Sequence, residues 1–118
     1  MIPLFLALAL LAFAAPAASA HAFLDHASPA VGSTVHGSPA QVQLLYTQNL
    51  EPAFSTVQVV DANGKQVDKG NKTVDPKNPA ELDVSLNTLS PGDYNVIWRV
   101  LSVDTHTTEG KFTFTVAP

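Results

Sequence analysis

Apolar and polar residues alternate over several short stretches of the chain. Residues 41–46, 82–86 and 111–116 each carry an apolar side chain at every second position. Because successive side chains of an extended strand point to opposite faces, this period of two indicates strands with one buried face. The positions predicted to face the core are Val42, Leu44, Tyr46, Leu82, Val84, Leu86, Phe112, Phe114 and Val116.

Two further strands are predicted from β-branched and apolar runs. Residues 55–60 are rich in β-branched side chains and are followed by Asn63-Gly64, a strong signal for a hairpin turn. Residues 94–103 are apolar on both faces in places, so we predict that they form the longest strand, in a central position. The segment before that strand, residues 89–94, resembles the tyrosine corner of sandwich domains.

The remaining segments are predicted to be connections. Residues 65–80 are polar and contain two prolines, which predicts a surface excursion with at most short edge strands. Breaker clusters at residues 28–30 and 37–39 enclose a short connecting segment. No stretch after residue 20 has helical periodicity. Short strands separated by turns predict an all-β fold, a small antiparallel β-sandwich.

The first twenty residues form a separate segment. They are almost wholly apolar, carry no charged side chain, and end in Ala18-Ser19-Ala20, small residues that a signal peptidase reads. We predict a cleaved signal peptide over residues 1–20 and a mature domain over residues 21–118 that begins with His21. The alternative is an uncleaved anchor, since about 20 apolar residues can span a bilayer.

The composition excludes several classes of protein. The chain has no cysteine, so neither a disulfide framework nor a thiolate metal site is available. The net charge of −4 comes entirely from residues after position 20, and there is no basic surface for nucleic acid. The only methionine is Met1, so no thioether remains for copper(I) once the signal peptide is removed.

Asp104 and His106 are the first candidates for metal ligands. They stand two residues apart, so an extended backbone would point both side chains to one face. A carboxylate oxygen with an imidazole nitrogen suits a divalent transition metal, with copper(II) high among the candidates. An N-terminal His21 would add its ring and its α-amine, whose pKa of about 7.7–8.0 lets a metal displace the proton easily. Together they supply three nitrogens and one oxygen, a tetragonal copper(II) set.

Simpler interpretations stay open beside this hypothesis. An Asp-x-His sequence is also typical of a solvated loop pair, and a histidine can follow a cleavage site by chance. His26 could join His21 as a further ligand, or it could face solvent or pack. Glu51 and Glu109 could support the ligands from outside or be solvated charges. His36 lies between turn signals and has no predicted role.

Several motifs match a known family. The most specific are Ser102-Val103-Asp104-Thr105-His106 and Glu109-Gly110-Lys111-Phe112-Thr113-Phe114; the others are His21, Ser28-Pro29-Ala30, Glu51-Pro52-Ala53-Phe54-Ser55, Leu89-Ser90-Pro91-Gly92-Asp93-Tyr94 and Trp98-Arg99. Over nearly the whole predicted mature chain they resemble the CopC family of periplasmic copper-binding proteins. The resemblance implies a monomeric, immunoglobulin-like Greek-key β-sandwich or barrel. It also implies one copper(II) ion per chain, bound by the amine and ring of His21 with Asp104 and His106.

The resemblance has one departure. Some members of that family also carry a copper(I) site in a methionine-rich loop with a histidine, but residues 61–80 here contain neither residue type. The resemblance therefore implies a copper(II)-only member. It further implies a CopD-type inner-membrane partner, in copper uptake or resistance.

Three functions can be compared on this basis. The first is a non-enzymatic protein that carries or sequesters copper(II). The second is an enzyme, because an N-terminal histidine chelate with a second imidazole also resembles the copper brace of lytic polysaccharide monooxygenases. Against the enzyme, the domain is small, and Asp104 would occupy a position that oxygen chemistry needs open. The third is a metal-free sandwich module for adhesion or assembly. We expect the first.

Overall fold

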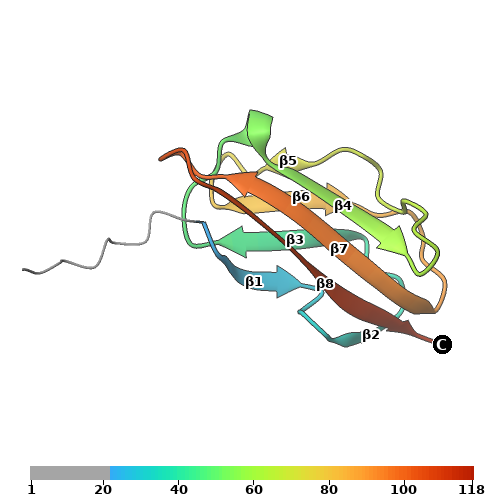
Figure 1. The fold of residues 1–118 in the computed structure, drawn as a ribbon. Helices are drawn as coiled ribbons and strands as arrows, with labels where there is room; N and C mark the ends of the chain where they lie inside the picture. Colours follow the sequence, from blue (N-terminus) through green and yellow to red (C-terminus); the bar gives the residue numbers. More distant parts are fainter. Residues whose placement is uncertain (1–21) are drawn as a thin grey trace, which may run out of the picture.

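Two four-stranded β-sheets pack face to face in the computed structural model, which describes residues 22–118 (Figure 1). The predicted signal peptide and His21 lie outside the described residues. The single helical element of residues 22–118 is a short 3₁₀ turn, η1 (Pro52–Phe54), and no helix there is long and apolar enough to cross a membrane. One sheet has the order β1 (Leu24–Ser28), β3 (Gln41–Tyr46), β6 (Glu81–Ser85), β5 (Thr73–Val74); the other has the order β2 (Thr34–His36), β8 (Thr107–Ala117), β7 (Gly92–Leu101), β4 (Thr56–Asp61).

The core lies between the sheets and is built from the alternating positions that the sequence predicts. Val42 and Leu44 of β3 and Phe114 of β8 are fully buried, and their neighbours on the outer faces are not. Each fully buried side chain of this size contributes about 1.5–3 kcal/mol to folding. All nine predicted core positions are buried, and the all-β sandwich is confirmed.

The edge strand β2 departs from the prediction. It lies in the segment that was expected to be only a connection, and it pairs with β8 in parallel, whereas the other strand pairs are antiparallel. The Gly32 amide donates to the Thr113 carbonyl at 2.8 Å, which brings the segment to the edge of β8. Three residues are too few for a visible period, so the sequence could not reveal this strand.

The predicted tyrosine corner is present at the start of β7. The hydroxyl of Tyr94 donates to the carbonyl of Ser90 at 2.6 Å, and its ring stacks on Phe114 with centroids 5.7 Å apart. β7 lies between β8 and β4, in the predicted central position. The prediction that this strand is the longest was wrong: β7 has 10 residues and ends at Leu101, whereas β8 has 11 residues.

The polar excursion over residues 65–80 is more closely attached to the sandwich than its polarity suggested. Gly64 has the positive φ of 82° that the predicted Asn-Gly turn requires, and β5 is a two-residue edge strand. Asp68, however, is only 7% exposed, and its carboxylate accepts hydrogen bonds from the amides of Val59 and Gly70, both at 2.8 Å. This carboxylate covers the outer edge of β4, so the prediction of a purely surface segment was wrong at Asp68.

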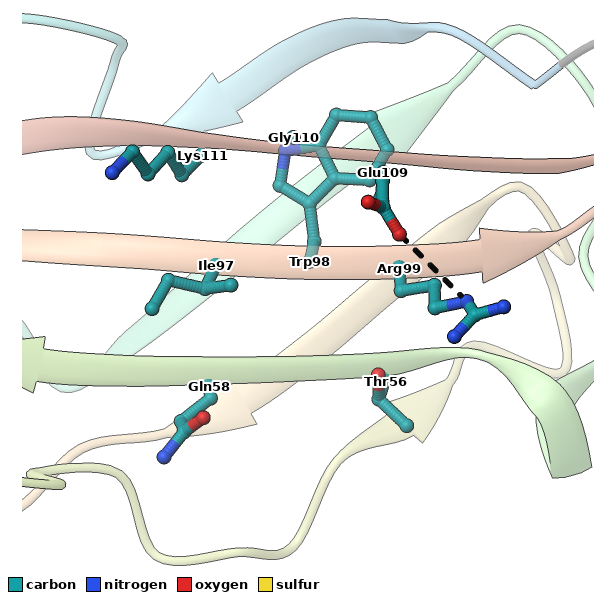
Figure 2. Close-up of a pocket in the computed structure, with 8 residues that line it drawn as sticks. All are labelled: Thr56, Gln58, Ile97, Trp98, Arg99, Glu109, Gly110 and Lys111. Atoms are coloured by element: carbon teal, nitrogen blue, oxygen red, sulfur yellow. Dashed lines mark ion pairs between the residues drawn. The ribbon is translucent and has the colours of Figure 1, made fainter.

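A shallow groove of about 530 Å³ lies on the outer face of the β4–β7–β8 sheet (Figure 2). Arg99 and Glu109 form an ion pair across it with 3.9 Å between Nε and Oε1, and both side chains are largely exposed. Exposed pairs of this kind contribute little to stability. Glu109, a candidate to support the metal ligands, is thus engaged with Arg99 on the sheet face. The other lining residues are Thr56, Gln58, Ile97, Trp98, Gly110 and Lys111.

Candidate metal centre

The candidate ligands lie in the tight turn that joins β7 to β8. The Thr105 amide donates to the Ser102 carbonyl at 2.9 Å, and the Ser102 amide donates to the His106 carbonyl at 3.0 Å. Thr105 has a φ of 75°, an uncommon value for a β-branched residue. The prediction that Asp104 and His106 share a face because the backbone is extended was therefore wrong in its premise. A turn, and not a strand, brings the two side chains together.

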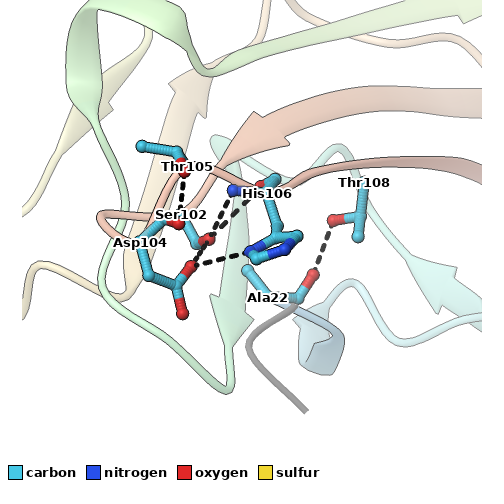
Figure 3. Close-up of polar contacts among 6 residues, drawn as sticks. All are labelled: Ala22, Ser102, Asp104, Thr105, His106 and Thr108. Atoms are coloured by element: carbon cyan, nitrogen blue, oxygen red, sulfur yellow. Dashed lines mark hydrogen bonds and ion pairs between the residues drawn. The ribbon is translucent and has the colours of Figure 1, made fainter. Parts of the chain in front are cut away.

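The side chains of Asp104 and His106 face each other across this turn (Figure 3). Oδ1 of Asp104 lies 3.5 Å from Nδ1 of His106. The Asp104 side chain is 40% exposed and the His106 side chain is 47% exposed, so an ion from solvent can reach both. A hard oxygen and an imidazole nitrogen are thus available to one metal ion.

Ser102 is hydrogen-bonded to both candidate ligands. It is fully buried, and its hydroxyl donates a hydrogen bond to Oδ1 of Asp104 and accepts one from the His106 amide at 3.3 Å. The Ser102 hydroxyl, followed by His106, lowers the pKa of Asp104 from its usual value. The carboxylate therefore stays ionised, which is the form that binds a metal ion.

Ser102 belongs to one of the motifs that match the CopC family, but its role was not predicted from the sequence. The signal that could have found it is a serine two residues before an aspartate in a turn, where such hydroxyls commonly bond to nearby polar groups. A second turn braces this end of β7. The Glu51 amide donates to the Leu101 carbonyl at 2.8 Å, and the Val103 amide donates to the Asn49 carbonyl at 3.0 Å. The backbone of Glu51 therefore lies next to the end of β7 that precedes the candidate ligands.

Ala22, the first residue that the structure describes, lies at the same end of the sandwich as the Asp104–His106 pair. The carbonyl of Ala22, a fully buried residue, accepts a hydrogen bond of 2.6 Å from the hydroxyl of Thr108, two residues after His106. In Figure 3 the His106 ring has the Asp104 carboxylate on one side and this hydrogen bond on the other. The N-terminal segment therefore reaches the same end of the sandwich as the turn.

The other histidines of residues 22–118 lie elsewhere. His26 is on β1, where it lines a hollow on the outer face of the other sheet with Gln43 and Glu81, and His36 is on the edge strand β2. Within residues 22–118, no three His, Cys, Asp or Glu side chains gather to form a complete metal site.

The fold and the sequence both match known proteins. The architecture is that of a small two-sheet β-sandwich domain. The model of the CopC domain matches residues 24–117, and the chain belongs to the CopC family. This match confirms the family resemblance and establishes a copper-related role.

Two solved structures and one further relative are similar over most of their lengths. The crystal structure of CopC from Methylosinus trichosporium OB3b has a TM-score of 0.78 and 40% identity, covering 83% of this chain and 95% of that one. That of PcoC, a methionine-rich copper resistance protein from Escherichia coli, has a TM-score of 0.70 and 31% identity, covering 82% and 99%. Copper resistance protein C of Pseudomonas syringae pv. tomato is 33% identical over 107 residues, 84% of this chain and 82% of that protein.

Proposed function

We propose that this chain is a periplasmic protein that binds one copper(II) ion and carries or sequesters it without catalysis. The ligands would be the amine and ring of His21, the carboxylate of Asp104 and the imidazole of His106. The observation that carries the proposal is the half-exposed Asp104–His106 pair, 3.5 Å apart, at the end of the sandwich where the buried Ala22 is bonded to Thr108.

Covalent geometry supports His21 as the third ligand residue. Consecutive Cα atoms are about 3.8 Å apart, so the neighbour of a fixed residue cannot lie far from it. Ala22 is fixed by burial and by its hydrogen bond to Thr108. Cleavage after Ala20 would make His21 the N-terminal residue, with both an amine and a ring nitrogen to offer.

The donor atoms favour copper(II) over copper(I). Copper(I) prefers thiolate and thioether sulfur, whereas imidazole, amine and carboxylate suit copper(II). The chain has no cysteine, and its only methionine, Met1, belongs to the predicted signal peptide. PcoC, by contrast, is described as methionine-rich. We infer a copper(II)-only member of the family.

The proposed physiological role rests on the relatives of this chain. The Pseudomonas syringae relative is a copper resistance protein. We propose a role in copper resistance or homeostasis for a monomer that can deliver copper to a CopD-type inner-membrane protein. Exchange of the ion needs open ligands, and the exposed turn that carries Asp104 and His106 meets this need.

An EPR-monitored copper(II) titration of the mature protein tests the proposal, after its mass has identified His21 as the first residue. We expect one equivalent to give a tetragonal, nitrogen-rich signal, and the affinity to fall between about pH 7 and pH 5 as protons compete for the nitrogens. His106→Ala should abolish the signal, and His36→Ala on the distant edge strand is the matched control. Weak or heterogeneous binding to the correctly processed protein would refute the proposal.

A further inference from the structure

We propose that Thr108 is a positioning residue for the copper site, because its hydrogen bond to Ala22 holds the N-terminal ligand against the Asp104–His106 pair. This inference rests on the proposed function, in which His21 is a ligand. It assigns a role to a side chain that would not itself touch the metal. The hydrogen bond joins residues 86 positions apart in the sequence.

The contact has the features of a fixed attachment. The Thr108 hydroxyl donates to the Ala22 carbonyl at 2.6 Å, a short and well-formed hydrogen bond. Thr108 lies at the start of β8 and pairs with Val100 of β7, so its backbone is held by the sheet. Its β-branched side chain has few accessible rotamers. The donor is therefore rigid on the side of the turn that carries His106.

Ala22 and Phe23 are attached to different parts of the sandwich. Chain termini are poorly ordered unless something ties them down. Ala22 has only a methyl group to bury, and the side chain of Phe23 is 52% exposed. Phe23 exchanges two hydrogen bonds with Thr47, at 3.0 Å from the Phe23 amide and 2.9 Å to its carbonyl. Those bonds hold Phe23, whereas the bond to Thr108 holds the residue to which His21 is attached.

The consequence is preorganisation of the ligand set. A chelating amine and ring that are already close to the other ligands lose less freedom when the ion binds. Removal of the Thr108 hydroxyl leaves the ligands Asp104 and His106 unchanged but lets the N-terminal residues move. The loss should therefore appear in copper affinity and in the nitrogen coordination of the bound ion.

The test compares three variants of the mature, full-length protein by chelator competition and EPR with copper(II) alone. Thr108→Val keeps the shape and strand propensity but removes the donor, and we expect about tenfold weaker binding with a mixed EPR signal of lower nitrogen content. Thr108→Ser keeps the hydroxyl and should restore most of the affinity. Thr107→Val is the matched control, since Thr107 is the exposed neighbour on the same strand and should bind as the parent does.

A double-mutant cycle separates positioning from general stability. If Thr108 acts through His21, the effect of Thr108→Val should shrink when His21→Ala has already removed the ring. A Thr108→Val protein with the parent's affinity and spectrum would overturn this inference alone. An equal loss in the presence and absence of the His21 ring would also overturn it. A parent protein with no nitrogen-rich copper(II) signal would overturn the proposed function and this inference together.

Discussion

Two aspartates on opposite parts of the sandwich show how the fold assigns different chemistry to the same residue type. Asp104, in the exposed β7–β8 turn, has its pKa lowered by the Ser102 hydroxyl and by His106. Asp83, on the outer face of β6, has its pKa raised to about 7 by burial and by the neighbouring carboxylates of Glu81 and Asp75. Asp104 is therefore an ionised and accessible candidate ligand, whereas the raised pKa of Asp83 favours its protonated form.

The surroundings of the two carboxylates explain this difference. Oδ1 of Asp83 is buried and has no hydrogen-bond partner, so its charged form is costly. Oδ1 of Asp104 receives a hydroxyl proton and faces an imidazole. An acidic residue is therefore a candidate metal ligand here because of the donors around it, and not because acidic residues are gathered there.

The largest expected effect comes from neutralising each aspartate in turn. Asp104→Asn should weaken copper(II) binding by more than about 100-fold, since loss of even an outer partner of a metal ligand typically costs 10–100-fold. Asp83→Asn makes the same chemical change and should leave the affinity unchanged. Chelator competition with copper(II) measures both. Equal losses of affinity in the two variants would show that the surroundings of the two carboxylates do not decide which one binds copper(II).

A second buried serine, Ser55, separates the effect of Ser102 on copper binding from its effect on stability. Ser102→Ala should reduce the free energy of unfolding by about 1–2 kcal/mol. It should also weaken copper(II) binding about 10–100-fold, because Asp104 and His106 lose a common partner. Ser55, equally buried at this end, bonds to the Glu51 carbonyl and the Leu101 amide but not to the ligands. Ser55→Ala should therefore cost similar stability, measured by urea unfolding, with little loss of affinity.

The two aspartates should affect stability in opposite directions as pH changes. Asp83 binds a proton more tightly in the folded state, so its contribution is present at low pH and is lost between about pH 4 and pH 7. Asp104 has a lowered folded pKa, so its contribution is present at neutral pH and is lost as acid protonates it.

The pH dependence of urea unfolding for the copper-free parent and Asp83→Asn checks the first statement. The variant should lose less stability than the parent between about pH 4 and pH 7. Identical pH profiles would show that Asp83 does not retain its proton in the folded protein.

The smallest effect is expected on the outer groove. Arg99→Ala removes the exposed ion pair with Glu109 and should change the free energy of unfolding by less than about 1 kcal/mol, with copper affinity unchanged. Glu109→Gln should behave in the same way. A marked loss of copper affinity in Glu109→Gln alone would instead link this carboxylate to the metal site.

Much of the fold could be predicted from local patterns because each pattern involves neighbours in the sequence. The alternation of Val42, Leu44 and Tyr46 is enough to specify a strand with one buried face, and it is buried as predicted. The tyrosine corner likewise joins residues four positions apart, Ser90 and Tyr94. The candidate pair Asp104–His106 was visible for the same reason.

Only the tertiary structure decided how these local pieces become a site. It paired β2 in parallel with β8, buried Asp68 against β4, and brought Ala22 to Thr108. It also ended β7 at Leu101 and placed a turn where an extended backbone was expected at Asp104 and His106. Contacts between distant residues leave no period in the sequence, so their partners become known only when the sheets are assembled. The sequence by itself determined which residue types are available as metal ligands and where the strands with a clear alternating pattern would form. The packing of the sandwich decided which of those residues meet.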